Sequence, residues 1–116
     1  MQFNISCINF VRYITNSMKK DDVLTPDQKA MARFAKAMGH PIRLYVLELL
    51  QNQNCCYSGD LTEVLPIAKS TLSQHLKELK DAGLIQGEIE APKIKYCLNQ
   101  ENWNLAKQLF ARLLME

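Results

Sequence analysis

Hydrophobic residues recur at helical spacing through the first half of the chain and predict two helices there. Thr25 and Pro26 are residue types that favour the start of a helix, and Gly39 is one that ends it. A second helix is expected directly afterwards, with His40 at the cap position and a polar break at residues 52–54. The apolar positions that define the two helices are Ala30, Met31, Phe34, Ala35 and Met38, followed by Ile42, Val46, Leu47, Leu49 and Leu50.

A short helix, a tight turn and a longer helix are expected next. Ser58 can cap the short helix over residues 59–65, and Pro66 lies in the turn that follows it. The longer helix is expected over residues 68–82, and Gly83 suits the left-handed geometry that ends it. The apolar stripe of this helix consists of Leu72, Leu76 and Leu79.

The hydrophobic period then changes and predicts two strands, over residues 84–89 and 94–98, joined by a turn. Asn99 can cap a final helix that carries a wide apolar stripe. The stripe consists of Trp103, Ala106, Leu109, Phe110, Leu113 and Leu114. It is too large for a small domain to bury alone, so we expect it to form a two-fold dimer interface.

The order of these elements predicts a mainly α fold with a small β-hairpin, within the α+β class. It is a winged helix-turn-helix with terminal dimerisation helices over residues 25–116. Residues 1–24 are expected to be a poorly defined N-terminal extension. Two interpretations of this extension stay open. Either translation naturally begins at Met18, or residues 1–17 form a short helix that packs on a partner subunit.

The helix expected over residues 68–82 has a polar face of unusual composition. Ordinary solvated faces are dominated by Glu and Lys, whereas this face also offers hydroxyl, amide and imidazole groups, which can hydrogen-bond to base edges and phosphates. The candidate DNA contacts on it are Lys69, Ser70, Thr71, Ser73, Gln74, His75 and Lys77. The alternative is a plain solvated surface. Against it stand the short helix and tight turn before this helix and the hairpin after it.

The predicted hairpin is the candidate wing. Lys93 and Lys95 can reach backbone phosphates or the minor groove, but Glu88 and Glu90 lie nearby. A nearly neutral wing predicts modest phosphate contacts. It also leaves open a second function, a winged helix used for protein–protein contact without operator binding.

Two segments resemble the ArsR/SmtB family of bacterial repressors: residues 37–44, Ala-Met-Gly-His-Pro-Ile-Arg-Leu, and residues 70–85, which open with Ser-Thr-Leu-Ser-Gln-His-Leu. The similarity covers about residues 28–99. It implies a homodimer that binds double-stranded operator DNA and often releases it on sensing a metal, a metalloid or a thiol-reactive signal. Family members commonly cap the recognition helix with Ser or Thr. This chain has Ala68 there, so we expect a weakened cap or one supplied by Ser70.

Charge and cysteine content change this interpretation little. The net charge of +2 permits nucleic-acid binding without arguing for it. No apolar run approaches the roughly 18 residues of a membrane-spanning helix, and the amino end lacks the features of a secretory signal. The four cysteines, at positions 7, 55, 56 and 97, do not resemble a disulfide framework. We therefore expect a reduced, cytoplasmic protein without membrane attachment.

Cys55 and Cys56, with Cys7 as a third ligand, are the candidate site for a soft metal or metalloid ion. Thiolates select ions such as arsenite, Cd²⁺ or Cu⁺ over hard ions. Members of the resembled family that sense soft metals often carry a Cys-x-Cys pair at the start of the helix before the turn. The two matching positions here hold Tyr57 and Gly59, so that pair is missing. The alternative is that one of the adjacent cysteines packs in the core and the other is incidental. Cys97 is expected to be a packing residue of the second strand.

Features of a catalytic site are not visible in the sequence. There is no nucleophile–base set, paired carboxylate cleft or phosphate-binding glycine loop, so we do not expect an enzyme. The predicted function is a sequence-specific DNA-binding transcriptional regulator, a dimeric repressor of the ArsR type. It has no certain cofactor, and a soft metal or metalloid ion is its candidate ligand.

Overall fold

The computed structural model describes residues 23–115 of the chain. Of these residues, 31–115 belong to one compact unit and 23–30 to another. The interpretations of residues 1–17 and the candidate ligand Cys7 lie outside the described residues. Within the described part, none of the helices combines the length and the apolarity that crossing a bilayer requires.

The first two helices begin where the sequence predicts, and the first ends before Gly39 as expected, whereas the second continues into the expected break at residues 52–54 and ends at Gln53. Helix α2 (Pro26–Met38) is capped by Thr25, whose hydroxyl accepts a hydrogen bond from the backbone N–H of Gln28 at 3.0 Å. Helix α3 (Pro41–Gln53) is capped by His40, whose Nδ1 accepts the N–H of Ile42 at 3.1 Å. Each cap satisfies a backbone donor that the first turn of a helix leaves free.

The short helix before the turn differs from its prediction. It is a 3₁₀ helix, η2 (Leu61–Glu63), and its cap is Asp60 rather than Ser58. The carboxylate of Asp60 accepts both the backbone N–H and the hydroxyl of Thr62, at 2.9 and 2.5 Å. Because a carboxylate competes well for these donors, the turn starts two residues later than expected and stays a single tight turn.

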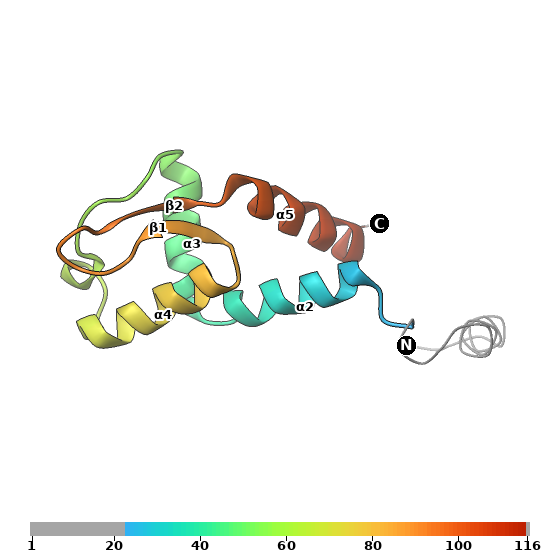
Figure 1. Ribbon diagram of the computed structural model, residues 1–116, viewed down its shortest axis with the longest axis horizontal. Coiled ribbons are helices and arrows are strands. Elements are labelled where there is room, and N and C mark those ends of the chain that lie inside the picture. The colour runs from blue at the N-terminus through green and yellow to red at the C-terminus, as the bar shows by residue number, and fades with distance from the viewer. Residues whose placement is uncertain (1–22, 116) are drawn as a thin grey trace. The chain divides into compact units, whose positions relative to one another are not determined.

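Helix α4 (Lys69–Asp81) follows, and then an antiparallel hairpin of β1 (Ile85–Glu88) and β2 (Lys95–Leu98). Gly83, at φ +82°, makes the left-handed turn between α4 and β1. Figure 1 shows α4, the hairpin and the final helix α5 (Gln100–Leu114) in this order. The winged helix-turn-helix prediction is confirmed.

The core lies where α3, α4, the hairpin and α5 meet. Its fully buried side chains are Val46, Leu47, Leu50, Leu61, Leu79, Leu84, Ile85, Tyr96 and Leu109. Helix α5 contributes Ala106 and Leu109 to it, each only 1% exposed. These two residues were expected in the dimer stripe, but they face the interior of the subunit instead. Only the outer part of the stripe remains available to a partner.

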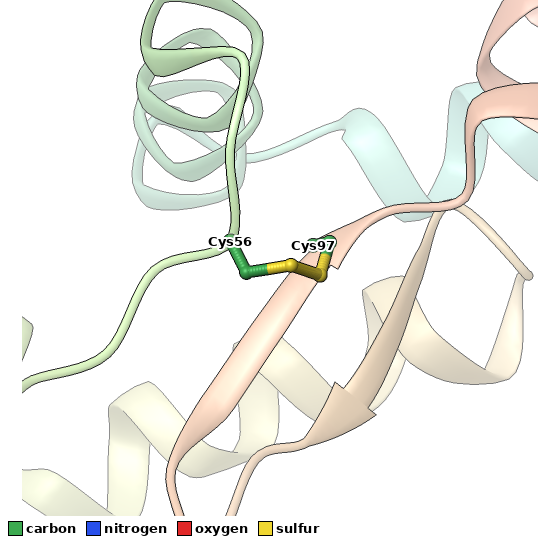
Figure 2. Close-up of a disulfide and its surroundings, with 2 residues drawn as sticks. All are labelled: Cys56 and Cys97. Atoms are coloured by element: carbon green, nitrogen blue, oxygen red, sulfur yellow. A yellow bond between two sulfur atoms is a disulfide. The ribbon is translucent and has the colours of Figure 1, made fainter.

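The expectation of unpaired cysteines is wrong for Cys56 and Cys97, which form a disulfide (Figure 2). Cys97 is therefore more than a packing residue. Next to it, Tyr57 forms a bridge with Tyr96 through backbone hydrogen bonds of 2.8 and 3.1 Å in both directions. An antiparallel register that pairs these tyrosines also places Cys56 opposite Cys97. The sequence could not show this, because the two cysteines are 41 residues apart.

Candidate nucleic-acid interface

Helix α4 presents most of its predicted DNA-contacting side chains to solvent. Those that are exposed are Lys69, Ser70, Thr71, Gln74 and Lys77, and Ser73 is half-buried. The opposite face is anchored by Leu72, Leu76 and Leu79, which are at most 7% exposed. The helix therefore has one side fixed in the core and one side free to enter a groove of DNA. As expected, its N-cap residue Ala68 makes no side-chain cap bond.

His75 does not lie on the exposed face, contrary to its prediction as a base contact. Its side chain is buried, and its Nδ1 accepts a hydrogen bond from Nε of Arg43 at 3.0 Å. Its ring centroid lies 4.1 Å from that of His40, the cap of α3. The helical spacing from Leu72 and Leu79 could have shown this, because positions three and four residues apart share a face.

Burial lowers the pKa of His75 below its ordinary value of 6.5, and the nearby His40 and Arg43 act in the same direction. The ring is therefore neutral near pH 7, with Nδ1 free of a proton to accept the Arg43 bond. His75 is a positioning residue that joins α3 to α4.

Arg43 makes contacts beneath the exposed face of α4 that the sequence interpretation missed. Besides His75, its guanidinium donates to the backbone carbonyls of Lys36 and Ala37, at 3.4 and 3.2 Å. These carbonyls lie in the last turn of α2, where acceptors lack the usual helical partner four residues on, and that of Lys36 also accepts the N–H of Gly39 at 3.4 Å. One side chain on α3 is thus hydrogen-bonded to both α2 and α4. The sequence drew attention to Arg43 only through its position in residues 37–44, one of the two segments that resemble the ArsR/SmtB family.

An ion pair lies at the start of α4. Nζ of Lys69 lies 3.4 Å from a carboxylate oxygen of Asp60, and the lysine side chain is 82% exposed. Hydrogen bonds from Thr62 lower the pKa of Asp60 below its ordinary value, so the carboxylate is charged at neutral pH. Such an exposed pair contributes little to stability. Lys69 can therefore leave Asp60 for a phosphate at small cost.

The hairpin has the form of a wing but carries little net charge. Lys93 lies exposed in the turn, and Lys95 is directly opposite Glu88 in the strand register. The hairpin is attached to α4 by Nζ of Lys80, which donates to the carbonyl of Gly87 at 2.7 Å. Gly87 has φ +114°, and a Cβ there would lie 2.3 Å from the carbonyl oxygen of Lys95. Residue 87 must therefore be glycine for strand β1 to pair with β2 as it does.

A strongly apolar groove lies between the second half of α2 and α5. Its volume is about 540 Å³, and its lining includes Met38, Trp103, Phe110, Ala111, Leu114 and Met115. Leu113, Leu114 and Met115 are 66%, 74% and 72% exposed. An exposed apolar surface of this kind commonly marks a protein–protein contact.

The cysteines line a second cavity, of about 360 Å³, which shares Trp103 and Lys107 with the groove. Cys55, Cys56 and Cys97 line it together with Trp103 and Lys107. Cys55 is exposed and carries a free thiol. Among residues 23–115, no group of three or more His, Cys, Asp or Glu is arranged to hold a metal ion.

Comparison with known proteins places this geometry in one family. The model of the bacterial regulatory protein family arsR matches residues 40–86. The HTH-type transcriptional regulator YgaV of Escherichia coli is 37% identical over 73 residues, which are 63% of this chain and 74% of YgaV. The arsenical resistance operon repressor of Bacillus subtilis is 41% identical over 70 residues, 60% of this chain and 66% of that protein.

The HTH-type transcriptional regulator CmtR of Mycobacterium tuberculosis is a further relative. It is 32% identical over 71 residues, which are 61% of this chain. The match spans 59% of the length of CmtR.

Proposed function

The chain belongs to the ArsR family of bacterial regulatory proteins, and from this membership we propose that it is a dimeric repressor that binds an inverted-repeat operator. The observation that carries the proposal is the exposed face of α4, presented between the η2 turn and the hairpin. The fold and the family are those of a DNA-binding transcriptional regulator. Because its proposed target is chromosomal DNA, we place it in the cytoplasm, and because its relatives are named as regulators and repressors, we assign it no enzymatic role.

The dimer part of the proposal depends on the apolar groove between α2 and α5. Two copies can cover this surface by two-fold symmetry, in which the same patch of each chain contacts the other. A two-fold dimer presents two copies of α4, and these read half-sites about one helical turn apart on the DNA. The symmetry of the protein therefore predicts the symmetry of the operator.

The side chains of α4 divide into two roles. Thr71, Ser73 and Gln74 lie within the first two turns, where side chains of a recognition helix reach base edges. Gln74 is exposed and can pair bidentately with adenine. Lys69, Ser70 and Lys77, with Lys93 and Lys95 of the wing, are assigned to phosphates, because cationic and hydroxyl groups suit the backbone.

Replacing Gln74 with alanine is expected to reduce discrimination between the operator and an altered half-site by about 1–3 kcal/mol, because a bidentate base contact is lost. Lys69→Ala should instead weaken binding to all sequences and lower the salt slope by about one unit. Fluorescence anisotropy titrations at several salt concentrations, with DNA from upstream of the gene, measure both effects. Gln108→Ala, an exposed glutamine on α5, is the matched control.

Equal losses on specific and non-specific DNA for both variants would contradict the assignment of base contacts. If the unmodified protein binds no DNA, the winged helix serves protein–protein contact instead, for which the nearly neutral wing is suited.

A second function, release of DNA by a soft metal or metalloid, is favoured by the cavity that Cys55, Cys56 and Cys97 share. Relatives include repressors named for arsenical resistance. A thiolate is the metal ligand, so Cys56 can bind an ion only when its disulfide with Cys97 is reduced. Cys7, the other proposed ligand, lies outside the described residues.

Arsenite or Cd²⁺ is expected to release operator DNA from the reduced protein, with a coupling of about 1–3 kcal/mol. Cys55→Ser and Cys56→Ser should each abolish the release, because each removes a thiolate ligand. Gel-shift titration with each ion measures the effect, and Cys7→Ser tests the third ligand. An equal response in all variants, or none in the unmodified protein, would show that these cysteines do not sense metal.

A further inference from the structure

The disulfide between Cys56 and Cys97 occupies a defined place in the sheet. Tyr57 and Tyr96 exchange two backbone hydrogen bonds, so the next residues form the narrow, non-hydrogen-bonded pair of an antiparallel ladder. The Cα atoms of Cys56 and Cys97 are 4.2 Å apart, which fits this pair. The backbone pairing therefore places the two cysteines directly opposite one another, at a separation that lets their sulfur atoms bond.

This disulfide joins two parts of the DNA-binding unit. Cys56 lies in the link between α3 and η2, the segment that leads into the turn before α4. Cys97 lies in β2, the second strand of the wing, as Figure 2 shows. When the bond is formed, the wing and the segment that leads to α4 are covalently connected. When it is broken, the link is held to the wing by the bridge between Tyr57 and Tyr96.

Small thiols can reach the bond. Both cysteines are half-buried rather than enclosed, and both line the open cavity of about 360 Å³ described above. Disulfides are rare in a compartment where thiols are kept reduced, and those that occur there are usually transient and redox-sensing. A regulator that acts on chromosomal DNA works in such a compartment.

We propose that the Cys56–Cys97 pair is a reversible thiol–disulfide switch, and that forming the bond tightens operator binding. This rests on the proposed function as a DNA-binding repressor. The reacting partner is a low-molecular-weight thiol, RSH. Its thiolate attacks one sulfur of the bond, the other cysteine leaves as a thiolate and takes a proton, and a mixed disulfide forms. A second RSH then releases RSSR, so the protein gains two electrons and the thiols lose two. RSSR drives the same steps in reverse.

The effect on affinity follows from preorganisation. Binding DNA requires the wing and α4 to be held in one relative arrangement, and ordering them costs free energy at the moment of binding. A covalent connection between the wing and the link before η2 reduces that cost in the oxidised protein. Coupling between two sites typically changes affinity about 5–150-fold, so we expect the reduced protein to bind its operator at least about fivefold more weakly.

The test uses the full-length protein in metal-free buffer, equilibrated with mixtures of glutathione and its disulfide. Operator affinity is measured by anisotropy, and alkylation followed by mass spectrometry counts the free thiols of each sample. The unmodified protein should lose at least about fivefold in affinity as two thiols appear. Cys56→Ser, Cys97→Ser and the double variant should each bind equally in all mixtures. Cys55→Ser should keep the redox dependence, which separates this switch from the proposed metal site.

Three results would overturn the switch. They are equal or weaker operator binding in the oxidised protein, redox dependence that survives in Cys56→Ser or Cys97→Ser, and loss of the folded circular-dichroism signal on reduction. In the last case the bond is only structural. Failure of every sample to bind DNA would instead overturn the proposed function itself, and the switch with it.

Discussion

Replacing Leu114 with glutamate is expected to separate the proposed dimer into monomers and to lower operator affinity about 10³-fold or more, toward the level of non-specific binding. Leu114 is 74% exposed and lines the apolar groove between α2 and α5. Burying a carboxylate there without a partner is costly, so two chains carrying it cannot close the interface. A monomer engages one half-site, and the second recognition helix no longer contributes to binding.

Sedimentation velocity and operator titration of the same samples measure this effect. The matched control is Gln108→Glu, which adds the same charge at another exposed position of α5. Leu109 is unsuitable for the test, because it is only 1% exposed and a charge there would disrupt the subunit itself. A Leu114→Glu protein that remains dimeric would place the interface elsewhere. An unmodified protein that is monomeric would contradict the dimer altogether.

Leu79→Ala is expected to lower the free energy of unfolding by about 2–5 kcal/mol, because it leaves a cavity under the recognition helix. Leu79 is 0% exposed and lies among the core residues that hold α4 in place. Urea denaturation followed by circular dichroism, at one protein concentration and without reductant, measures the change. Reductant is left out because breaking the disulfide alters stability by itself.

Lys77→Ala is the matched control on the same helix, because Lys77 is exposed and the change should stay within about 0.5 kcal/mol. If Leu79→Ala lowered the free energy of unfolding by less than about 1 kcal/mol, the neighbouring side chains would have moved into the vacated space and no cavity would remain. The pair of variants also separates residues that position α4 from residues that contact DNA. We expect Leu79→Ala to act through stability and Lys77→Ala, at a proposed phosphate contact, to act only on affinity.

Local residue choice was enough to determine most of the secondary structure. Thr25, His40 and Asn99 each cap the helix that the sequence assigns to them, and Gly83 ends α4. These interactions join residues at most a few positions apart, so they can be predicted from the sequence. The hydrophobic period likewise determined which face of α4 is buried, and it would have placed His75 on that face if applied strictly. The family resemblance, confirmed by comparison, came from the same local segments.

The tertiary structure decided what depends on partners far apart in the chain. Arg43 joins three helices only because the fold brings the end of α2 and His75 of α4 within hydrogen-bond reach of its guanidinium. Leu109 is buried and Leu114 exposed along one apolar stripe, since the rest of the subunit covers only part of α5. Cys56 meets Cys97 because the link before η2 pairs with β2 at the tyrosine bridge. Spacing along a sequence carries no information on such pairings, because the long-range register of strands and helices is set by packing in three dimensions.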